Sequence, residues 1–174
     1  MIEGVCLTVH EPAMSHMAPL AWALNQTSGP ILECGAGMYS TPLLHALCWP
    51  SRPLVTLETH PQWYAAVAGF ANEYHTIRKI EAWRDEPFDG MWSVVFIDSR
   101  PRKSRVALIE RLRDRADVIV LHDYGATKDR SKRGCVGPEI ESVRSFPNSA
   151  IYTAIKNNHT ALMSDRFDVS GVNA

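Results

Sequence analysis

Four short apolar runs in this sequence end in acidic residues, and the last of them ends in a His-Asp pair. The residues concerned are Glu33, Glu58, Asp98 and the pair His122-Asp123. Near-continuous apolar runs of this length are typical of buried parallel strands. The carboxyl ends of such strands meet at one edge of a sheet, where ligands bind. Carboxylates and imidazoles at that edge can hydrogen-bond a ligand and accept a proton, so the sequence predicts a ligand site with acid–base chemistry.

A glycine turn follows the first of these acids and is followed in turn by an apolar run at helical spacing. Gly35 and Gly37 can adopt positive φ and carry no side chain, so the backbone can approach a ligand closely. Ser40 or Thr41 is a candidate N-cap, and Pro42 suits the first turn of a helix. A helix that begins behind a glycine turn is typical of a nucleotide site.

Two details of this segment bear on which nucleotide-like ligand binds. The third glycine of the dinucleotide fingerprint is missing, and Glu33 beside the turn would repel a pyrophosphate. A carboxylate there suits the amino group and sulfonium of S-adenosylmethionine instead. Glu58 lies 21 residues after Gly37 and can accept hydrogen bonds from both ribose hydroxyls. The alternative is that Glu58 only interacts with a helix dipole, and an NAD-dependent oxidoreductase remains a weaker interpretation.

The elements that position these residues alternate between strand and helix, which predicts an α/β fold with a doubly wound, mostly parallel sheet. Two further strands separated by four residues must be antiparallel and close the sheet as a hairpin. Residues 165–174 read as a frayed tail. We expect strands at 31–34, 54–58, 76–80, 93–98, 117–123, 150–155 and 160–163, and helices at 13–26, 41–48, 61–74, 102–114 and 138–145.

The composition fits one soluble domain spanning residues 1–174. The net charge of −1 excludes a global field that would select nucleic acid or membrane. The four cysteines form no C-x-x-C pair, which favours reduced thiols in a cytoplasmic protein. No apolar run reaches the roughly 18 residues that span a bilayer, and no signal pattern opens the chain, so we expect no membrane partner.

The ordered motifs resemble the class I, Rossmann-like S-adenosylmethionine-dependent methyltransferases over about residues 28–165. The closest resemblance is to short members in which an E-x-G-x-G turn precedes a Ser-Thr pair and an acid-x-x-P-x-W-Y segment opens the next helix. The resemblance implies a seven-stranded sheet in the order 3-2-1-4-5-7-6 with the last strand antiparallel. The motifs are Glu33-Cys34-Gly35-Ala36-Gly37, Leu57-Glu58-Thr59-His60-Pro61-Gln62-Trp63-Tyr64, Val95-Phe96-Ile97-Asp98 and Val120-Leu121-His122-Asp123-Tyr124.

The resemblance also implies where the cofactor lies. The glycines would face its methionine part and Glu58 its ribose. His60 or Trp63 would flank the adenine, and the segment Glu81-Ala82-Trp83 would lie near the ring. Asp98 would approach the methionine amino group or a metal. The cofactor-binding residues expected are Glu33, Gly35, Gly37, Ser40, Thr41, Glu58, His60, Trp63, Ala82, Trp83 and Asp98.

Methyl transfer needs alignment of donor and acceptor and a group that removes a proton. The candidates for catalysis are His122, Asp123 and Asp98. Some relatives bind a divalent ion with acids at these strand ends, and carboxylates suit Mg²⁺. We favour no metal, because such relatives show a fuller acidic set; Asp98 would then orient the cofactor, and Asp123 would cap the following turn.

The sequence says less about the acceptor half of the site. Two basic runs would rim it, and their charge is either solvated surface charge or a sign of an anionic acceptor. Residues 1–28 and the loop 124–138 are free to build a lid, and a second subunit is another way to complete the site. We therefore expect methyl transfer to a small or anionic acceptor through oxygen or nitrogen, with nucleic acid not favoured. The alternatives are cleavage of the cofactor and a nonenzymatic binding subunit. The basic runs are Arg100, Arg102, Lys103 and Arg105, and Lys128, Arg130, Lys132 and Arg133.

Overall fold

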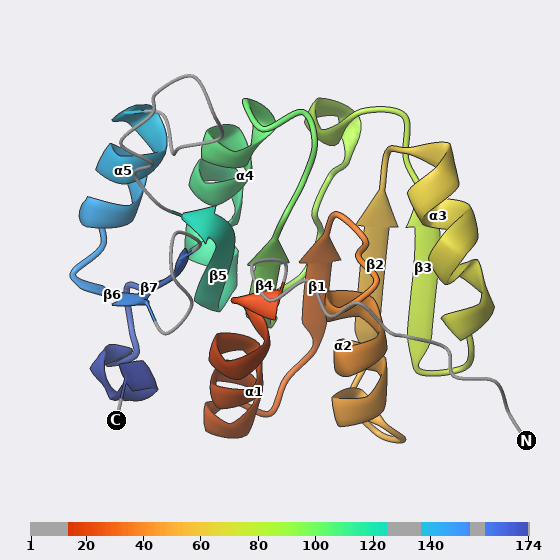
Figure 1. Cartoon of the computed structure of the whole chain (residues 1–174), viewed down its shortest axis with the longest axis horizontal. Helices are drawn as coiled ribbons and strands as arrows, with labels where there is room; N and C mark the ends of the chain where they lie inside the picture. The colour runs from red at the N-terminus through yellow and green to blue at the C-terminus, as the bar shows by residue number, and fades with distance from the viewer. Residues whose placement is uncertain (1–13, 125–136, 154–158, 174) are drawn as a thin grey trace, which may run out of the picture.

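A single twisted sheet of seven strands runs through the described part of the protein, which comprises residues 14–124, 137–153 and 159–173 of a computed structural model. The strand order is β3-β2-β1-β4-β5-β7-β6. The first five strands pair in parallel, and β7 pairs antiparallel with both β5 and β6, as Figure 1 shows. The strands are β1 (Ile31–Cys34), β2 (Leu54–Glu58), β3 (His75–Lys79), β4 (Trp92–Ile97), β5 (Ala116–Tyr124), β6 (Asn148–Tyr152) and β7 (His159–Ser164).

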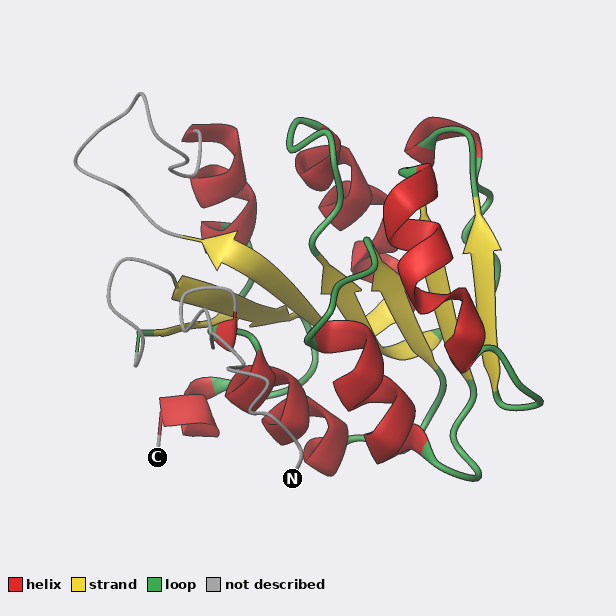
Figure 2. Ribbon diagram, turned by 45° about the vertical axis from the view of Figure 1, so that its right-hand side comes forward, coloured by secondary structure: helices red, strands yellow, loops and turns green. Residues whose placement is uncertain are grey.

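Helices cover both faces of this sheet (Figures 1 and 2). On one face, α1 (Met17–Gln26) and α2 (Ser40–Cys48) pack with the 3-10 turn η5 (Ser170–Asn173) against the sheet. On the other, α4 (Ser104–Leu112) and α5 (Gly137–Arg144) enclose a second apolar layer. The helix α3 (Pro61–Val67) lies along β3. Each central strand contributes alternate side chains to the two layers, which explains the near-continuous apolar runs.

The register of the parallel strands brings the predicted residues to one edge. Cys34 is level with Leu57 of β2 and with Ile97 of β4, and Ile97 is level with Leu121 of β5. The residues that follow these positions therefore lie together at the carboxyl ends of the strands. The fold class and strand order expected from the sequence are confirmed.

Several expected boundaries are wrong. The first helix begins at Met17, so Pro19 lies in its first turn. The third ends at Val67 and passes into the 3-10 turn η2 (Ala68–Phe70), since Gly69 disfavours a continued helix. The tail is not frayed over residues 165–173, because Val169 and Val172 are buried in the core.

Other expectations fall outside the described residues. These are the first part of the proposed lid (1–13), most of the second basic loop (125–136) and the joint of the terminal hairpin (154–158). Cys34 and Cys48 are free, buried thiols. Within the described ranges, every helix is too short or too polar to span a bilayer.

Candidate functional site

The glycine turn is held tightly between two neighbouring strands. Gly35 has φ +103°, and its N–H donates to the carbonyl of Leu57 at 2.9 Å. A Cβ at this position would lie 2.6 Å from the carbonyl oxygen of Asp98. Only glycine fits such a contact and such a φ. The turn is therefore fixed directly against the end of β4.

Glu58 closes the turn from the other side. Its Oε2 accepts the N–H of Ala36 at 2.8 Å, and its Oε1 accepts the N–H groups of Thr59 and His60, each at 2.7 Å. The carboxylate thus caps the start of α3, whose N-cap residue, His60, makes no side-chain cap bond. Oε1 also accepts the Thr59 hydroxyl at 3.4 Å, so its lone pairs are occupied. Oε2 retains capacity for one further donor, such as a ribose hydroxyl.

Glu33 lies behind the turn and is fully buried. Its Oε2 accepts hydrogen bonds from Thr41 at 2.9 Å and Thr56 at 2.7 Å. Burial raises the pKa of Glu33 to about 7, although the nearby hydroxyls of Ser40, Thr56 and Thr41 lower it. Ser40 and Thr41 are buried too, and neither caps α2, whose N-cap is Tyr39. Contact of these three residues with a cofactor stays a prediction.

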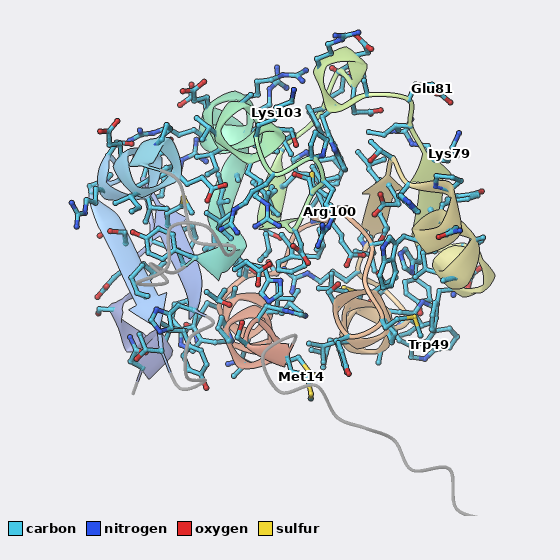
Figure 3. All side chains as sticks on the ribbon, turned by 45° about the horizontal axis from the view of Figure 1, so that its top comes forward. Met14, Trp49, Lys79, Glu81, Arg100 and Lys103 are labelled. Atoms are coloured by element: carbon cyan, nitrogen blue, oxygen red, sulfur yellow. The ribbon has the colours of Figure 1, made fainter. Side chains whose placement is uncertain are left out.

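A cavity of about 570 Å³ opens between Thr59, the segment after β3 and the start of α4, and neither the glycines of the turn nor Glu58 line it. Figure 3 looks onto this edge, with Glu81 and Lys103 on either side. Its walls are mostly apolar, as an aromatic base requires. His60 and Trp63 are exposed and do not line it. The lining residues are Thr59, Glu81, Ala82, Trp83, Arg84, Pro101, Lys103, Ser104, Ala107, Leu108 and Arg111.

Asp98 and His122 form a hydrogen-bonded pair at the ends of β4 and β5. Nδ1 of His122 lies 3.0 Å from Oδ2 of Asp98, while Nη2 of Arg105 donates to Oδ1 at 2.5 Å. Burial alone would raise the pKa of Asp98, but the hydrogen bond and charge of His122 and the charge of Arg105 hold it below its ordinary value. An ionised Asp98 fixes the proton of His122 on Nδ1 and leaves Nε2 as the basic atom.

Arg105, which the sequence indicated as either surface charge or part of the rim of an acceptor pocket, is buried beside Asp98. Its side chain is only 3% exposed, and it also donates to the carbonyls of Ser99 and His122. Arg102 is likewise engaged, with Glu139 of α5 and the carbonyl of Asp123. Two members of the first basic run therefore fix the edge of the sheet instead of rimming a pocket. Arg100 and Lys103 are exposed.

His16, which precedes α1, is a second residue that sequence reasoning missed. Its ring lies edge-on to that of His122, with centroids 4.5 Å apart, and packs against Phe96. Both nitrogens of His16 and Nε2 of His122 are buried, with no hydrogen-bond partner among the described residues. Burial, and then the charge of His122, lower the pKa of His16 to about 3. Buried polar atoms without partners point to a ligand or water at this place.

Asp123 completes the edge. It has φ +58°, which is uncommon for a residue other than glycine and is found often at functional positions. Its Oδ1 lies 3.5 Å from Nε2 of His122. The positive φ lies within the register shift of β5 between Leu121 and Tyr124, directly after His122.

Asp98, His122 and Asp123 lie near enough to one another to hold a cation, with ligand atoms within 4.8 Å. The fit to Mg²⁺ is poor, because Arg105 and His122 occupy the oxygens of Asp98. A buried guanidinium beside the carboxylate also repels a dication. We therefore derive no step through a metal.

Replacing His16 by phenylalanine is expected to reduce acid sensitivity. The pKa of His16 is about 3 in the folded protein and 6.5 in the reference state. The unfolded chain therefore gains its proton first as the pH falls, and wild-type stability drops. His16 contributes about 3 kcal/mol to the loss between about pH 7 and 4, and His16→Phe removes that share. Urea denaturation at the two pH values measures it.

His16→Gln serves as the matched variant, since it removes the titrating group and keeps polar atoms. Both variants should lose less free energy of unfolding than the wild type between about pH 7 and 4. Only His16→Phe should raise the free energy of unfolding near neutral pH, by about 1 kcal/mol, because it removes unpaired buried nitrogens. If both variants lose as much free energy of unfolding between these pH values as the wild type does, His16 is not buried and neutral.

Solved methyltransferase structures share this fold. A putative O-methyltransferase from Klebsiella pneumoniae is 17% identical, with TM-score 0.66 over 92% of this chain and 83% of that one. An O-methyltransferase from Bacillus cereus, in complex with SAH, is 15% identical, with TM-score 0.63 over 91% and 83%. The O-methyltransferase TomG from Streptomyces achromogenes, in complex with SAM, is 19% identical, with TM-score 0.60 over 91% and 82%.

These similarities confirm the class I methyltransferase fold that the motifs indicate, and at such identities they show the fold alone. No family model matches the sequence, and no curated protein is significantly similar to it.

Proposed function

We propose that this protein is an S-adenosylmethionine-dependent methyltransferase that acts on a small or anionic acceptor through an oxygen or nitrogen nucleophile. The observation that carries the proposal is the Asp98–His122 pair beside the glycine turn. A donor turn and an oriented base at one edge are the two parts that methyl transfer requires. The neighbours described as O-methyltransferases support a small-molecule acceptor.

On this proposal, the donor half is built by Gly35, Gly37 and Glu58, with the cavity at Ala82 and Trp83 receiving the adenine. Bound S-adenosylmethionine supplies an electrophilic methyl group on a sulfonium. Glu58 orients the ribose, and the fixed turn sets the depth at which the methionine part lies. The protein need not activate the methyl group, because the positive charge of the sulfonium already makes it electrophilic.

The acceptor half is built by His122 and its partners. Nε2 of His122 removes the proton from the acceptor hydroxyl or amine as the new bond to carbon forms. Asp98 holds the imidazole in the required tautomer, and Arg105 holds Asp98. The ring of His16 packs edge-on against His122 and helps to fix its position. Exposed Arg100 and Lys103 are available to an anionic acceptor.

Calorimetry against S-adenosylmethionine, S-adenosylhomocysteine and NAD tests the donor half. We expect the first two to bind and NAD not to bind. Glu58→Ala should weaken S-adenosylmethionine binding by about tenfold to a hundredfold, because hydrogen bonds to a charged group are lost. Glu73→Ala, at an exposed acid beyond α3, is the matched control and should leave affinity unchanged. Binding of NAD alone, or unchanged affinity in Glu58→Ala, contradicts the assignment.

A further inference from the structure

A chain of hydrogen-bonded polar side chains begins on α2 and runs across β3 and β2 to Glu33 of β1. It has no part in the steps proposed above. Nδ1 of His45 lies 3.0 Å from Nδ1 of His75. Nε2 of His75 lies 2.8 Å from Oγ1 of Thr56. Thr56 then donates to Oε2 of Glu33 at 2.7 Å. His75, Thr56 and Glu33 are all fully buried, so the chain is sealed from water over most of its length.

The outer end of this chain reaches the surface. His45 is half-buried, and the hydroxyl of Tyr74 lies 2.8 Å from its Nε2. The ring of Tyr74 packs edge-on against Trp49, which is exposed and is labelled in Figure 3. The chain therefore connects a position near solvent with a carboxyl group that solvent does not reach.

One arrangement of protons satisfies each contact along the chain when Glu33 is ionised, although the other oxygen of Glu33, Oε1, has no hydrogen-bond partner among the described residues. Thr56 has a single hydroxyl proton and donates it to Glu33, so its oxygen accepts the Nε2–H of His75. Burial, and then the charge of His45, lower the pKa of His75 to about 4, so this ring is neutral near pH 7. Its Nδ1 lone pair then accepts the Nδ1–H of His45. All donors point towards Glu33 and stabilise its negative charge together.

The inner end of the chain acts on the glycine turn. Oε2 of Glu33 also accepts the hydroxyl of Thr41, whose oxygen accepts the N–H of Gly37 at 3.1 Å. The other titratable groups around Glu33 are the thiols of Cys34 and Cys48 and the carboxylate of Asp98. Burial raises the pKa of both thiols, so they are neutral near pH 7, and Asp98 opposes ionisation of Glu33. Ionisation of Glu33 is favoured by the hydroxyl groups that donate to it and by the histidines hydrogen-bonded behind Thr56.

We propose that Thr56, oriented by His75, is a positioning residue that sets the charge of Glu33, and that this charge makes the turn prefer a cationic donor to its neutral product. The proposal rests on the proposed function. S-adenosylmethionine carries a sulfonium cation, whereas S-adenosylhomocysteine carries a neutral thioether. An ionised Glu33 behind the turn attracts the first and not the second. Loss of the methyl group then removes the attraction and favours release of the product.

The experiment measures both affinities by calorimetry between about pH 6 and 8.5, with circular dichroism to establish folding. The proteins are wild type, Thr56→Val, His75→Gln and Thr76→Val. Thr76 is exposed on the same strand as His75 and is the matched control. His75→Gln keeps a donor for Thr56. Titration of the ligands' own amino groups near pH 8 is common to all four proteins and cancels between them.

In the wild type, the preference for S-adenosylmethionine should rise about tenfold as Glu33 ionises. In Thr56→Val this rise should move to higher pH, because a hydrogen bond to the ionised carboxylate is lost. His75→Gln and Thr76→Val should behave like the wild type. The proposal is overturned if the wild type's preference for S-adenosylmethionine over S-adenosylhomocysteine does not change with pH. It is also overturned if Thr56→Val weakens the binding of both ligands equally at every pH. Failure of either ligand to bind wild type would instead contradict the proposed function.

Discussion

Replacing His122 by glutamine is expected to lower the rate of methyl transfer by about a hundredfold to ten-thousandfold and to leave the affinity for S-adenosylmethionine unchanged. Glutamine keeps a polar side chain of similar reach but cannot accept a proton. The donor contacts at Gly35 and Glu58 do not involve His122. Initial rates under saturating donor, together with calorimetric affinity, measure the two effects separately.

Asp98→Asn should reproduce much of this loss, because an amide does not hold the tautomer that leaves Nε2 basic. Asp165→Asn is the matched control. Asp165 is also about a third exposed and also pairs with an arginine, Arg113, at 2.6 Å, but it follows β7 and lies at the opposite edge of the sheet. Its replacement should leave the rate unchanged. Full activity in His122→Gln would show that another group removes the proton.

Gly35→Ala is expected to destabilise the protein and to abolish cofactor binding. The added Cβ would lie 2.6 Å from one backbone atom of Asp98 and 2.7 Å from another, at a φ of +103°. Backbone strain and overpacking together cost about 2 to 5 kcal/mol. Because the obstructing atoms are backbone, the end of β4 must move, and Asp98 moves with it. Urea denaturation gives the stability change.

Gly69→Ala is the comparison for this variant. Gly69 lies in the 3-10 turn after α3, with nothing within 4 Å of a built Cβ. Its replacement should leave stability unchanged or raise it by up to about 1 kcal/mol. If both glycine variants unfold at the same urea concentration, the turn is not pressed against β4 as described.

The glycine turn was predictable because its signals are local. An apolar run, two glycines and a later acid indicate a strand, a turn and the end of the next strand in sequence order, and Glu58 lies where that order places it. Its contact with a ribose stays a prediction. The local pattern does not show which partners a polar side chain hydrogen-bonds in the folded protein. Ser40 and Thr41 look like helix caps, yet Thr41 bridges Gly37 and Glu33 inside the protein.

Arg105 and His16 were missed for a related reason, although both left a signal. Arg105 looks like one member of a basic run, but it shares the buried stripe of α4 with Leu108, Ile109 and Leu112. His16 likewise precedes Leu20 by four residues and continues the buried face of α1. The guanidinium of Arg105 is buried because it meets partners at the ends of distant strands, whereas the buried nitrogens of His16 have no hydrogen-bond partner among the described residues. The local sequence shows neither fact.

Methyl transfer is tested by incubating the protein with methyl-labelled S-adenosylmethionine and separate pools of metabolites, RNA, DNA and protein. Each pool is run with wild type and His122→Gln, with and without Mg²⁺. We expect the wild type to transfer label to the metabolite pool independently of Mg²⁺, and His122→Gln to transfer much less. Label in no pool, or turnover of the donor without any acceptor, would contradict this expectation, the latter indicating cleavage of the cofactor.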